Sequence, residues 1–257
     1  MSDKLSKIGS VEKALQILEC FTRKDPFLTL DEIANRTGFS RTTTFRMICS
    51  LEKFGYIKRK PTAGELQFSL GWAFLEKAQL VNEQIDIKEM AKEEMLQLRN
   101  QTGLSIQLAV RDGLDAVYIE QFESLKPFRL YPEIGRRAPL YSAACPRVLL
   151  AFLPDRERED LLQKFTYNSF TSHTLTSPER IRAELVKIRE NGYAISKGEL
   201  HEGTIAIAAP IFNFSQRVVA SLSIIGLESD FTDMKMDELI GLLKSKADAI
   251  SQKLRGN

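Results

Sequence analysis

Apolar residues in the first third of the chain recur every three or four positions, which is the spacing of an amphipathic helix. A first helix is predicted after a Ser10 cap, with an apolar side made of Val11, Ala14, Leu15, Leu18 and Phe21. A second helix follows Thr29 and ends at Gly38, because glycine tolerates the left-handed backbone that ends a helix. A third helix is predicted from a Ser40 cap to Gly55.

The third predicted helix has two chemically different sides. At 100° per residue, one side predicts packing by Thr44, Met47, Ile48, Leu51 and Phe54, while Thr42, Arg46, Cys49 and Lys53 lie opposite. Residues 56–70 then predict two short strands around a Pro/Gly turn, with Leu66 and Phe68 alternating with Glu65 and Gln67. Helix, helix, glycine turn, helix and hairpin is the order of a winged helix-turn-helix domain.

The remaining chain mixes helical and extended patterns. Residues 70–80 and 87–101 predict two helices with a weak break between them, which indicates a linker. Leu104–Arg111 and Leu114–Phe122 flank Asp112-Gly113, a dipeptide typical of β-hairpins. Further helices are predicted at 146–153, 155–165, 178–191 and 233–254, and further strands at 193–196, 204–212 and 218–226. This mixed order predicts an α+β fold on a mainly antiparallel sheet.

Composition and charge narrow the function. The 257 residues are 43% hydrophobic and 27% charged, which is ordinary for a globular protein of one or two domains. The apolar stretches are shorter than the roughly 20 residues of a membrane helix, and the first residues lack the apolar core of a signal peptide. We therefore expect a cytoplasmic protein without membrane contact. The net charge is only +2, yet Arg36–Lys60 holds seven basic residues and one acid, Glu52, which is typical of a polyanion binder or of a solvated helix face.

The start of the third predicted helix carries residues that can bind DNA. A helix fits the major groove and presents polar and arginine side chains from its first turns, while hairpin lysines and arginines reach the backbone beside the groove. Candidate DNA-binding residues are Ser40, Arg41, Thr42, Thr43, Phe45 and Arg46 on the helix and Lys58, Arg59 and Lys60 on the hairpin. The alternative is a three-helix domain whose charges only solubilise it.

Candidate catalytic residues are few. The sequence has no GxSxG, GxxxxGK or GxGxxG motif, and its three cysteines and two histidines are scattered, so we expect no catalytic residue, cofactor, metal or disulfide. Cys145 before Pro146 could be a thiol activated at a helix start, and His201 beside Glu199 and Glu202 could be a base. A small buried cysteine and a partly exposed loop histidine are the simpler interpretations.

The order of several sequence blocks resembles the IclR-type (isocitrate lyase regulator) family of bacterial transcription regulators. The blocks, in chain order, are SVEKALQILECF, LTLDEIANRTGFSRTTTFRMICSLEKFGYI, FSLG, LSIQLAVRDGLDAVYIEQ, IGRRAPLYSAACPRVLLAFLP, ENGYAISKGELHEGTIAIAAPIF and VVASLSIIG. The resemblance covers nearly the whole chain. It implies a winged helix, a linker helix and a GAF-like effector domain, with dimers, often paired into tetramers, on partly palindromic operators.

The resemblance also implies an effector-binding pocket formed by three segments of the second domain. The residues at the matching positions are Ala143, Ala144, Cys145, Ser196, Ala206, Ser223 and Ile225. Family members that bind small keto acids are expected to carry polar residues at the positions of Ser196, Ala206 and Ile225. Two of these are apolar here, which argues against a ligand as small as pyruvate and favours a larger, partly hydrophobic acid. Ordinary packing within the sheet is the alternative for each residue.

These observations predict a DNA-binding transcription regulator, with repression as the expected mode and a small organic acid as effector. The expected domains are a winged helix-turn-helix over residues 1–70, a linker helix over 71–86 and a GAF-like effector domain over 87–257. Expected partners are double-stranded DNA and further copies of the chain, because one winged helix reads only half of a site. Apolar residues of the linker, namely Trp72, Phe74, Leu75 and Leu80, are expected to pack on the partner chain or on helix 10–21. The alternatives are a small-molecule enzyme with a winged-helix appendage and a protein that binds a partner through its linker helix.

Overall fold

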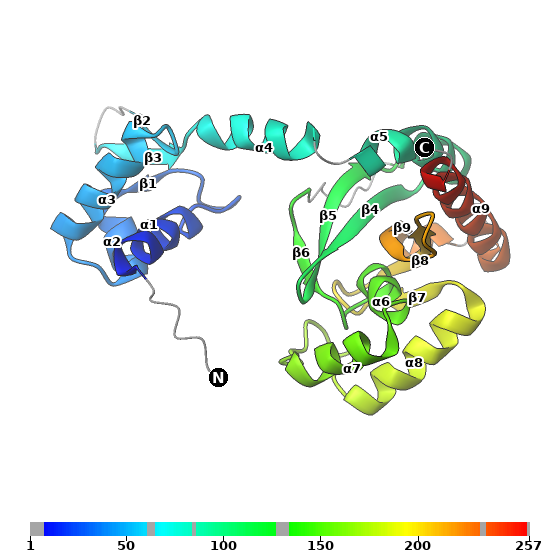
Figure 1. Cartoon of the computed structure of the whole chain (residues 1–257). Helices are drawn as coiled ribbons and strands as arrows, with labels where there is room; N and C mark the ends of the chain where they lie inside the picture. Colours follow the sequence, from blue (N-terminus) through cyan, green and yellow to red (C-terminus); the bar gives the residue numbers. More distant parts are fainter. Residues whose placement is uncertain (1–7, 61–64, 84–85, 127–133, 232–234, 256–257) are drawn as a thin grey trace. The chain divides into compact units, whose positions relative to one another are not determined.

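The chain divides into two compact units, residues 1–85 and 86–257, in the computed structural model (Figure 1). The structure describes residues 8–60, 65–83, 86–126, 134–231 and 235–255. None of the helices in these ranges is long and apolar enough to cross a membrane.

The first unit is a winged helix followed by one more helix. Its elements are α1 (Gly9–Glu19), β1 (Leu28–Thr29), α2 (Leu30–Thr37), α3 (Arg41–Lys53), β2 (Ile57–Lys60), β3 (Gln67–Leu70) and α4 (Ala73–Glu83). The three strands form an antiparallel sheet in the order β1-β3-β2. The core lies between the sheet and the first three helices and is made of Ile17, Phe21, Leu28, Ile33, Ile48, Ile57 and Phe68.

Short-range polar contacts set the ends of α2 and α3, as predicted. The Thr29 hydroxyl accepts the Glu32 N–H at 3.3 Å, and the Glu32 carboxylate accepts the Thr29 N–H at 2.7 Å, which is a capping box. Gly38 ends α2 with φ of 71°, and the Ser40 hydroxyl accepts the Thr43 N–H at 3.2 Å at the start of α3. These contacts fix where α2 begins and ends and where α3 begins.

Several predictions for the first unit are wrong. Ser10 lies inside α1, whose N-cap is Ile8, and no side chain caps this helix. Val11 and Leu15 are 53% and 56% exposed and Ile17 is fully buried, whereas Leu18 and Phe21 pack in the core as predicted, so the buried side of α1 is shifted from the one predicted.

Phe54 was predicted to pack and Leu66 to be one of the apolar residues that alternate along a strand, yet the two are 69% and 39% exposed. Phe54 follows the last residue of α3, where the chain turns away from the core. Leu70 belongs to strand β3 and not to a helix, and the predicted turn at residues 61–64 lies outside the described residues.

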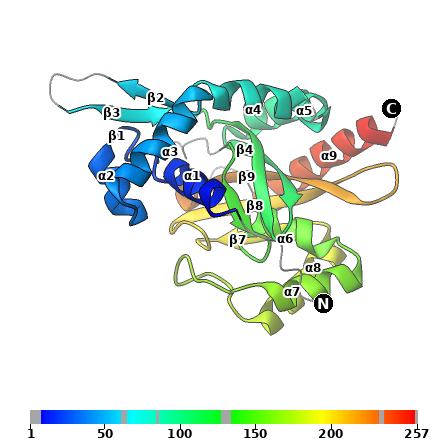
Figure 2. The same cartoon turned by 60° about the vertical axis from the view of Figure 1, so that its left-hand side comes forward.

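The second unit is a six-stranded antiparallel sheet with helices on both faces. Its elements are α5 (Asp86–Thr102), β4 (Ser105–Asp112), β5 (Asp115–Phe122), β6 (Arg137–Pro139), α6 (Ala144–Ala151), α7 (Asp155–Lys164), α8 (Pro178–Asn191), β7 (Ala194–Lys197), β8 (Thr204–Phe212), β9 (Val218–Leu227) and α9 (Met236–Arg255). The strand order is β6-β5-β4-β9-β8-β7, and each neighbouring pair is antiparallel. Helix α6 packs on one face with α8 behind it, and α5 and α9 pack together on the other (Figures 1 and 2).

The two faces of the sheet carry side chains of different size. The residues that face away from α6 are large, for example Ile106, Leu108, Ile207, Leu222 and Ile224. The residues that face α6 alternate with them and are mostly small, for example Ala109, Ala194, Ser196, Ala206, Ala208 and Ser223. Small side chains let α6 approach the sheet closely, and they leave free space beside the start of that helix.

Candidate DNA interface and effector cavity

The predicted DNA-binding residues lie on the surface of the first unit. Eight of the nine are exposed, and Thr43 is half-buried, with its hydroxyl 2.9 Å from that of Ser40. Arg41 is paired with Asp31 of α2 at 3.0 Å, while Thr42 and Arg46 point outward from the exposed side of α3. The first turns of α3 therefore present a polar and basic surface.

The three basic residues of β2 point to opposite faces of the small sheet. Arg59 faces α3: its guanidinium is 2.8 Å from the Glu52 carboxylate and 5.8 Å from the centre of the Phe45 ring. The hydrogen bond from Arg59 to Glu52 raises the pKa of the guanidinium. Lys58 and Lys60 alternate with Arg59 along β2, so their side chains lie on the opposite face of the small sheet.

Two aromatic rings hold the lysines of β2. The Lys58 ammonium lies 4.4 Å from the centre of the Trp72 ring, and the Lys60 ammonium lies 3.9 Å from that of Phe27. Arg59 thus lies beside the exposed side of α3, and the two lysines belong to a separate surface of the same sheet.

A cavity of about 20 Å³ lies between the start of α6 and strands β4, β5, β7, β8 and β9 of the second unit. It is lined by six of the seven predicted effector residues, which are Ala143, Cys145, Ser196, Ala206, Ser223 and Ile225. Ala144 is fully buried and does not belong to the lining. These six residues lie far apart in the sequence, from Ala143 to Ile225, and they line the same cavity.

Seven further lining residues were not assigned to the effector site from the sequence, although His201 beside Glu199 had been considered as a base. They are Gln107, Tyr118, Arg136, Glu199, Leu200, His201 and Thr204. Gln107 pairs with Ser223 across β4 and β9, so both side chains point to the same face of the sheet. Strand alternation alone could not have found them, because it does not tell which strands pair.

Buried polar groups beside α6 distinguish this cavity from ordinary packing. Ser223 is fully buried and lines the cavity, and its hydroxyl oxygen has no hydrogen-bond partner among the described residues. Ala143, the N-cap of α6, has φ of 51° and ψ of −179°, a conformation that L-residues rarely adopt. Such strain is typical of segments that bind a ligand.

Cys145 is not a nucleophile. Its side chain is buried, and this burial raises the pKa of the thiol from its usual 9.0 to about 11. A thiol with that pKa stays protonated at neutral pH, whereas reactive cysteines are thiolates. The interpretation as a small buried cysteine is confirmed, and His201 is exposed in a loop as expected.

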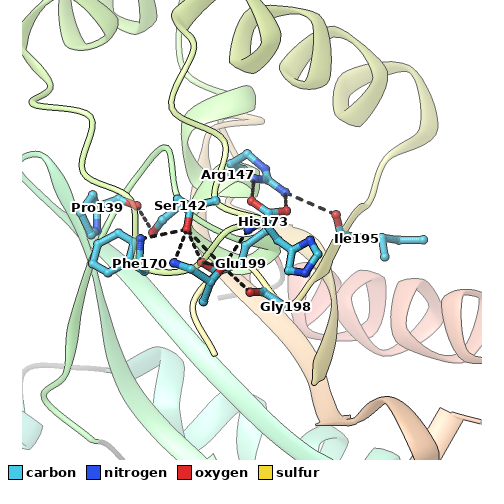
Figure 3. Close-up of polar contacts among 10 residues, drawn as sticks. Pro139, Ser142, Arg147, Phe170, His173, Ile195, Gly198 and Glu199 are labelled. Carbon is cyan, nitrogen blue, oxygen red and sulfur yellow. Dashed lines mark hydrogen bonds and ion pairs between the residues drawn. The ribbon is translucent and has the colours of Figure 1, made fainter. Parts of the chain in front are cut away.

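Arg147 of α6 and Glu199 of the loop before β8 form a buried ion pair (Figure 3), and Glu199 also lines the cavity. The Nη2 atom of Arg147 donates to Oε1 of Glu199 at 2.7 Å, and Nη1 pairs with Oε2. The same loop is held by Thr171, whose hydroxyl donates to the Gly198 carbonyl at 2.7 Å, and by Thr174, whose hydroxyl donates to the Glu199 carbonyl at 2.7 Å. Glu199 is thus fixed in both its side chain and its backbone.

A winged helix with a polar and basic third helix is the arrangement found in many DNA-binding transcription regulators. The chain belongs to the IclR family of bacterial transcription regulators: residues 10–61 match the IclR helix-turn-helix domain, and residues 79–252 match the bacterial transcriptional regulator IclR C-terminal domain. Members of this family regulate transcription and are not enzymes, which confirms the predicted function class.

Relatives match over nearly the full length. The HTH-type transcriptional regulator KipR of Bacillus subtilis is 40% identical over 249 residues, which cover 97% of this chain and 98% of KipR. The transcriptional repressor IclR of Escherichia coli is 25% identical over 239 residues, 90% of this chain and 85% of the relative.

Solved structures have the same fold. Thermotoga maritima IclR superposes with a TM-score of 0.78 at 29% identity, covering 96% of this chain and 99% of that one. An IclR homolog of Microbacterium hydrocarbonoxydans, complexed with 4-hydroxybenzoate, superposes with a TM-score of 0.81 at 21% identity, covering 96% of this chain and the whole of the other.

Proposed function

We propose that this protein is a repressor whose affinity for its operator is controlled by a small organic acid bound in the cavity beside α6. The observation that carries this proposal is the fully buried Ser223 hydroxyl, which lines the cavity without a hydrogen-bond partner among the described residues. A buried polar group without a partner costs about 1–3 kcal/mol, and a ligand that hydrogen-bonds to it removes this cost.

The chemistry of the lining favours an acid. The first N–H groups of a helix bind anions, and Ala143 and Cys145 at the start of α6 line the cavity. Ser196 and Ser223 supply hydroxyl groups that orient a ligand, while Ala206 and Ile225 supply apolar surface. A few polar groups on an apolar wall are typical of small-molecule sites.

The small size of the cavity links binding to a conformational change. A volume of about 20 Å³ holds about one water molecule, so an organic acid enters only when the walls move apart. The ligand-bound form therefore differs from this one, and a ligand that binds one form better shifts the population toward it. The names of two similar proteins are consistent with this proposal, since one is a repressor and one binds 4-hydroxybenzoate.

We also propose that the DNA-bound form is a homodimer or tetramer on a partly palindromic operator, in the cytoplasm, where bacterial DNA lies. The supporting observation is a set of exposed apolar side chains on α1 and at α4, namely Val11, Leu15, Trp72, Leu75 and Leu80, each more than half exposed. Phe74 is the exception, because it packs on Tyr56 with the ring centres 5.2 Å apart. Residues 1–70 would bind DNA, 71–86 link, and 87–257, with a GAF-like fold, bind the effector.

A DNA-binding assay with candidate effectors tests the proposal. Footprinting on the DNA beside the protein's own coding region identifies the operator, and a thermal-shift screen of keto acids, sugar acids and aromatic acids identifies ligands through the stability they add. We expect a stabilising acid to change operator affinity by about 1–3 kcal/mol of coupling. The proposal is wrong if the protein binds no DNA, or if no stabilising ligand alters DNA binding.

A further inference from the structure

We infer that Phe45 of α3 recognises a thymine of the operator by packing its ring on the 5-methyl group of that base. This inference rests on the proposed binding of an operator and adds a base preference to it. The sequence placed Phe45 among the candidate DNA-binding residues without giving the ring a role of its own. The role follows from the surroundings of the ring.

Phe45 is an apolar side chain on a surface that is otherwise polar. It is 41% exposed, although phenylalanine is one of the residue types most often buried. Every residue of α3 is described, and its other exposed side chains are polar or charged, namely Arg41, Thr42, Arg46, Ser50 and Lys53. Phe45 does not belong to the hydrophobic core of the first unit, so the packing of this unit does not account for the ring.

The ring lies between the outward side of α3 and strand β2. Phe45 follows Thr42 by three residues and directly precedes Arg46, so it is a neighbour of both on the helix surface. On the side of β2, the Arg59 guanidinium lies 5.8 Å from the ring centre and is itself held by Glu52 at 2.8 Å. A helix that enters the major groove with Thr42 and Arg46 foremost therefore brings the ring to the edges of the base pairs.

A phenyl ring can distinguish thymine from the other bases. Guanine, adenine and cytosine present only hydrogen-bond donors and acceptors in the major groove, whereas thymine also presents its 5-methyl group. Covering a polar base edge with an apolar ring costs free energy, because the ring supplies no hydrogen bond in place of water. Packing on the methyl group instead buries apolar surface of both partners, which is favourable. The ring therefore favours thymine.

Removal of single methyl groups tests this inference on the full chain. The operator found by footprinting is synthesised with each thymine in turn replaced by deoxyuridine, which lacks the 5-methyl group and keeps every hydrogen-bonding atom. Affinity is measured by fluorescence anisotropy for the wild type, Phe45→Ala and Phe54→Ala, at low salt, where a weakened variant still binds. Phe54 is the matched control, because it is a phenylalanine that is 69% exposed and directly follows the last residue of α3.

We expect one or more positions at which deoxyuridine weakens wild-type binding about three- to fivefold, which is the effect of exposing one methyl-sized group. At these positions Phe45→Ala should bind thymine and deoxyuridine with equal affinity, because the partner of the methyl group is gone. Phe54→Ala should respond like the wild type at every position. Phe45 lies outside the core, so the circular dichroism spectrum of Phe45→Ala should match that of the wild type.

The inference is overturned if the wild type responds to deoxyuridine at no position, or if Phe45→Ala responds like the wild type at all of them. It is also overturned if Phe54→Ala loses the same responses, because the loss would then not be specific to the ring of Phe45. In each of these cases the operator is still bound, and the proposed function stands. If the wild type binds no DNA, the proposed function is wrong as well.

Discussion

Arg147 and Glu199 are 52 residues apart in the sequence and form a buried ion pair that joins α6 to the loop before β8. Both elements contribute residues to the cavity, Ala143 and Cys145 at the start of α6 and Leu200 and His201 in the loop. We therefore expect a movement of this loop to be transmitted to α6, because separating the pair would leave each buried charge without its partner.

Breaking this ion pair should strongly destabilise the protein. Glu199→Gln leaves the Arg147 guanidinium buried without its counter-ion, and we expect the free energy of unfolding to fall by about 3–5 kcal/mol in urea denaturation. The matched control is Glu159→Gln, which removes the exposed pair with Arg182, and it should cost at most about 1 kcal/mol. Equal effects of the two variants would contradict the importance of burial.

Arg46 should determine operator specificity. Arg46→Ala removes an exposed guanidinium from α3 and should weaken operator binding by about 1–3 kcal/mol, with little effect on random DNA. Arg59→Ala, which removes the basic side chain of β2 beside α3, should instead weaken binding to all sequences alike and reduce its salt dependence. Both are measured by fluorescence anisotropy at two salt concentrations. Unchanged operator affinity for Arg46→Ala would show that α3 does not read the site.

The exposed apolar residues should mediate assembly. We expect light scattering to give a dimer or a larger oligomer at micromolar concentration, and Leu75→Glu to shift it toward the monomer. Leu75 is 61% exposed, and burying a glutamate against apolar surface is costly. Val186→Glu is the control, because Val186 is 54% exposed on α8 of the other unit. A monomeric wild type would end this proposal.

Ser223 should contribute to ligand binding and not to DNA binding. Ser223→Val removes the hydroxyl that faces the cavity, and Ala206→Phe fills the cavity, so both should reduce the response to an effector while unliganded DNA binding stays intact. Ser221→Val is the matched control, because Ser221 is equally buried and lacks a hydrogen-bond partner for its hydroxyl among the described residues, but does not line the cavity. The pocket is misassigned if Ser223→Val and Ala206→Phe both respond to the effector like the wild type.

Cys145 should make stability depend on pH in the alkaline range. Burial raises the pKa of its thiol from 9.0 to about 11, so the folded state keeps a proton that the unfolded state releases. The contribution is fully present below pH 9 and is lost as the pH rises to about 11, by about 2–3 kcal/mol at most.

The comparison of variants isolates this contribution. Cys145→Ala should lose less stability than the wild type between pH 8 and pH 11 in urea denaturation, whereas Cys49→Ala, at a half-buried position, should follow the wild type. Parallel stability curves for the wild type and Cys145→Ala would contradict the elevated pKa.

The amino-acid sequence by itself determined the features that depend on neighbours along the chain. The Ser40 cap, the start of a helix after Thr29 and the Gly38 helix end were predicted correctly, because each depends on a contact within four residues or on the preference of one residue. The hairpin around Asp112-Gly113 was predicted for the same reason. Six effector residues were placed together only through their resemblance to a known family.

Tertiary structure alone decided which apolar positions are buried and which residues meet at the cavity. Val11 and Ile17 are both apolar residues of α1, yet only the packing of α2, α3 and the sheet selects Ile17 for the core. Arg136 and Glu199 come to the same cavity because β5 pairs with β6 and the loop before β8 folds back onto α6. Such contacts depend on the pairing of distant segments, which the local pattern of a sequence does not encode.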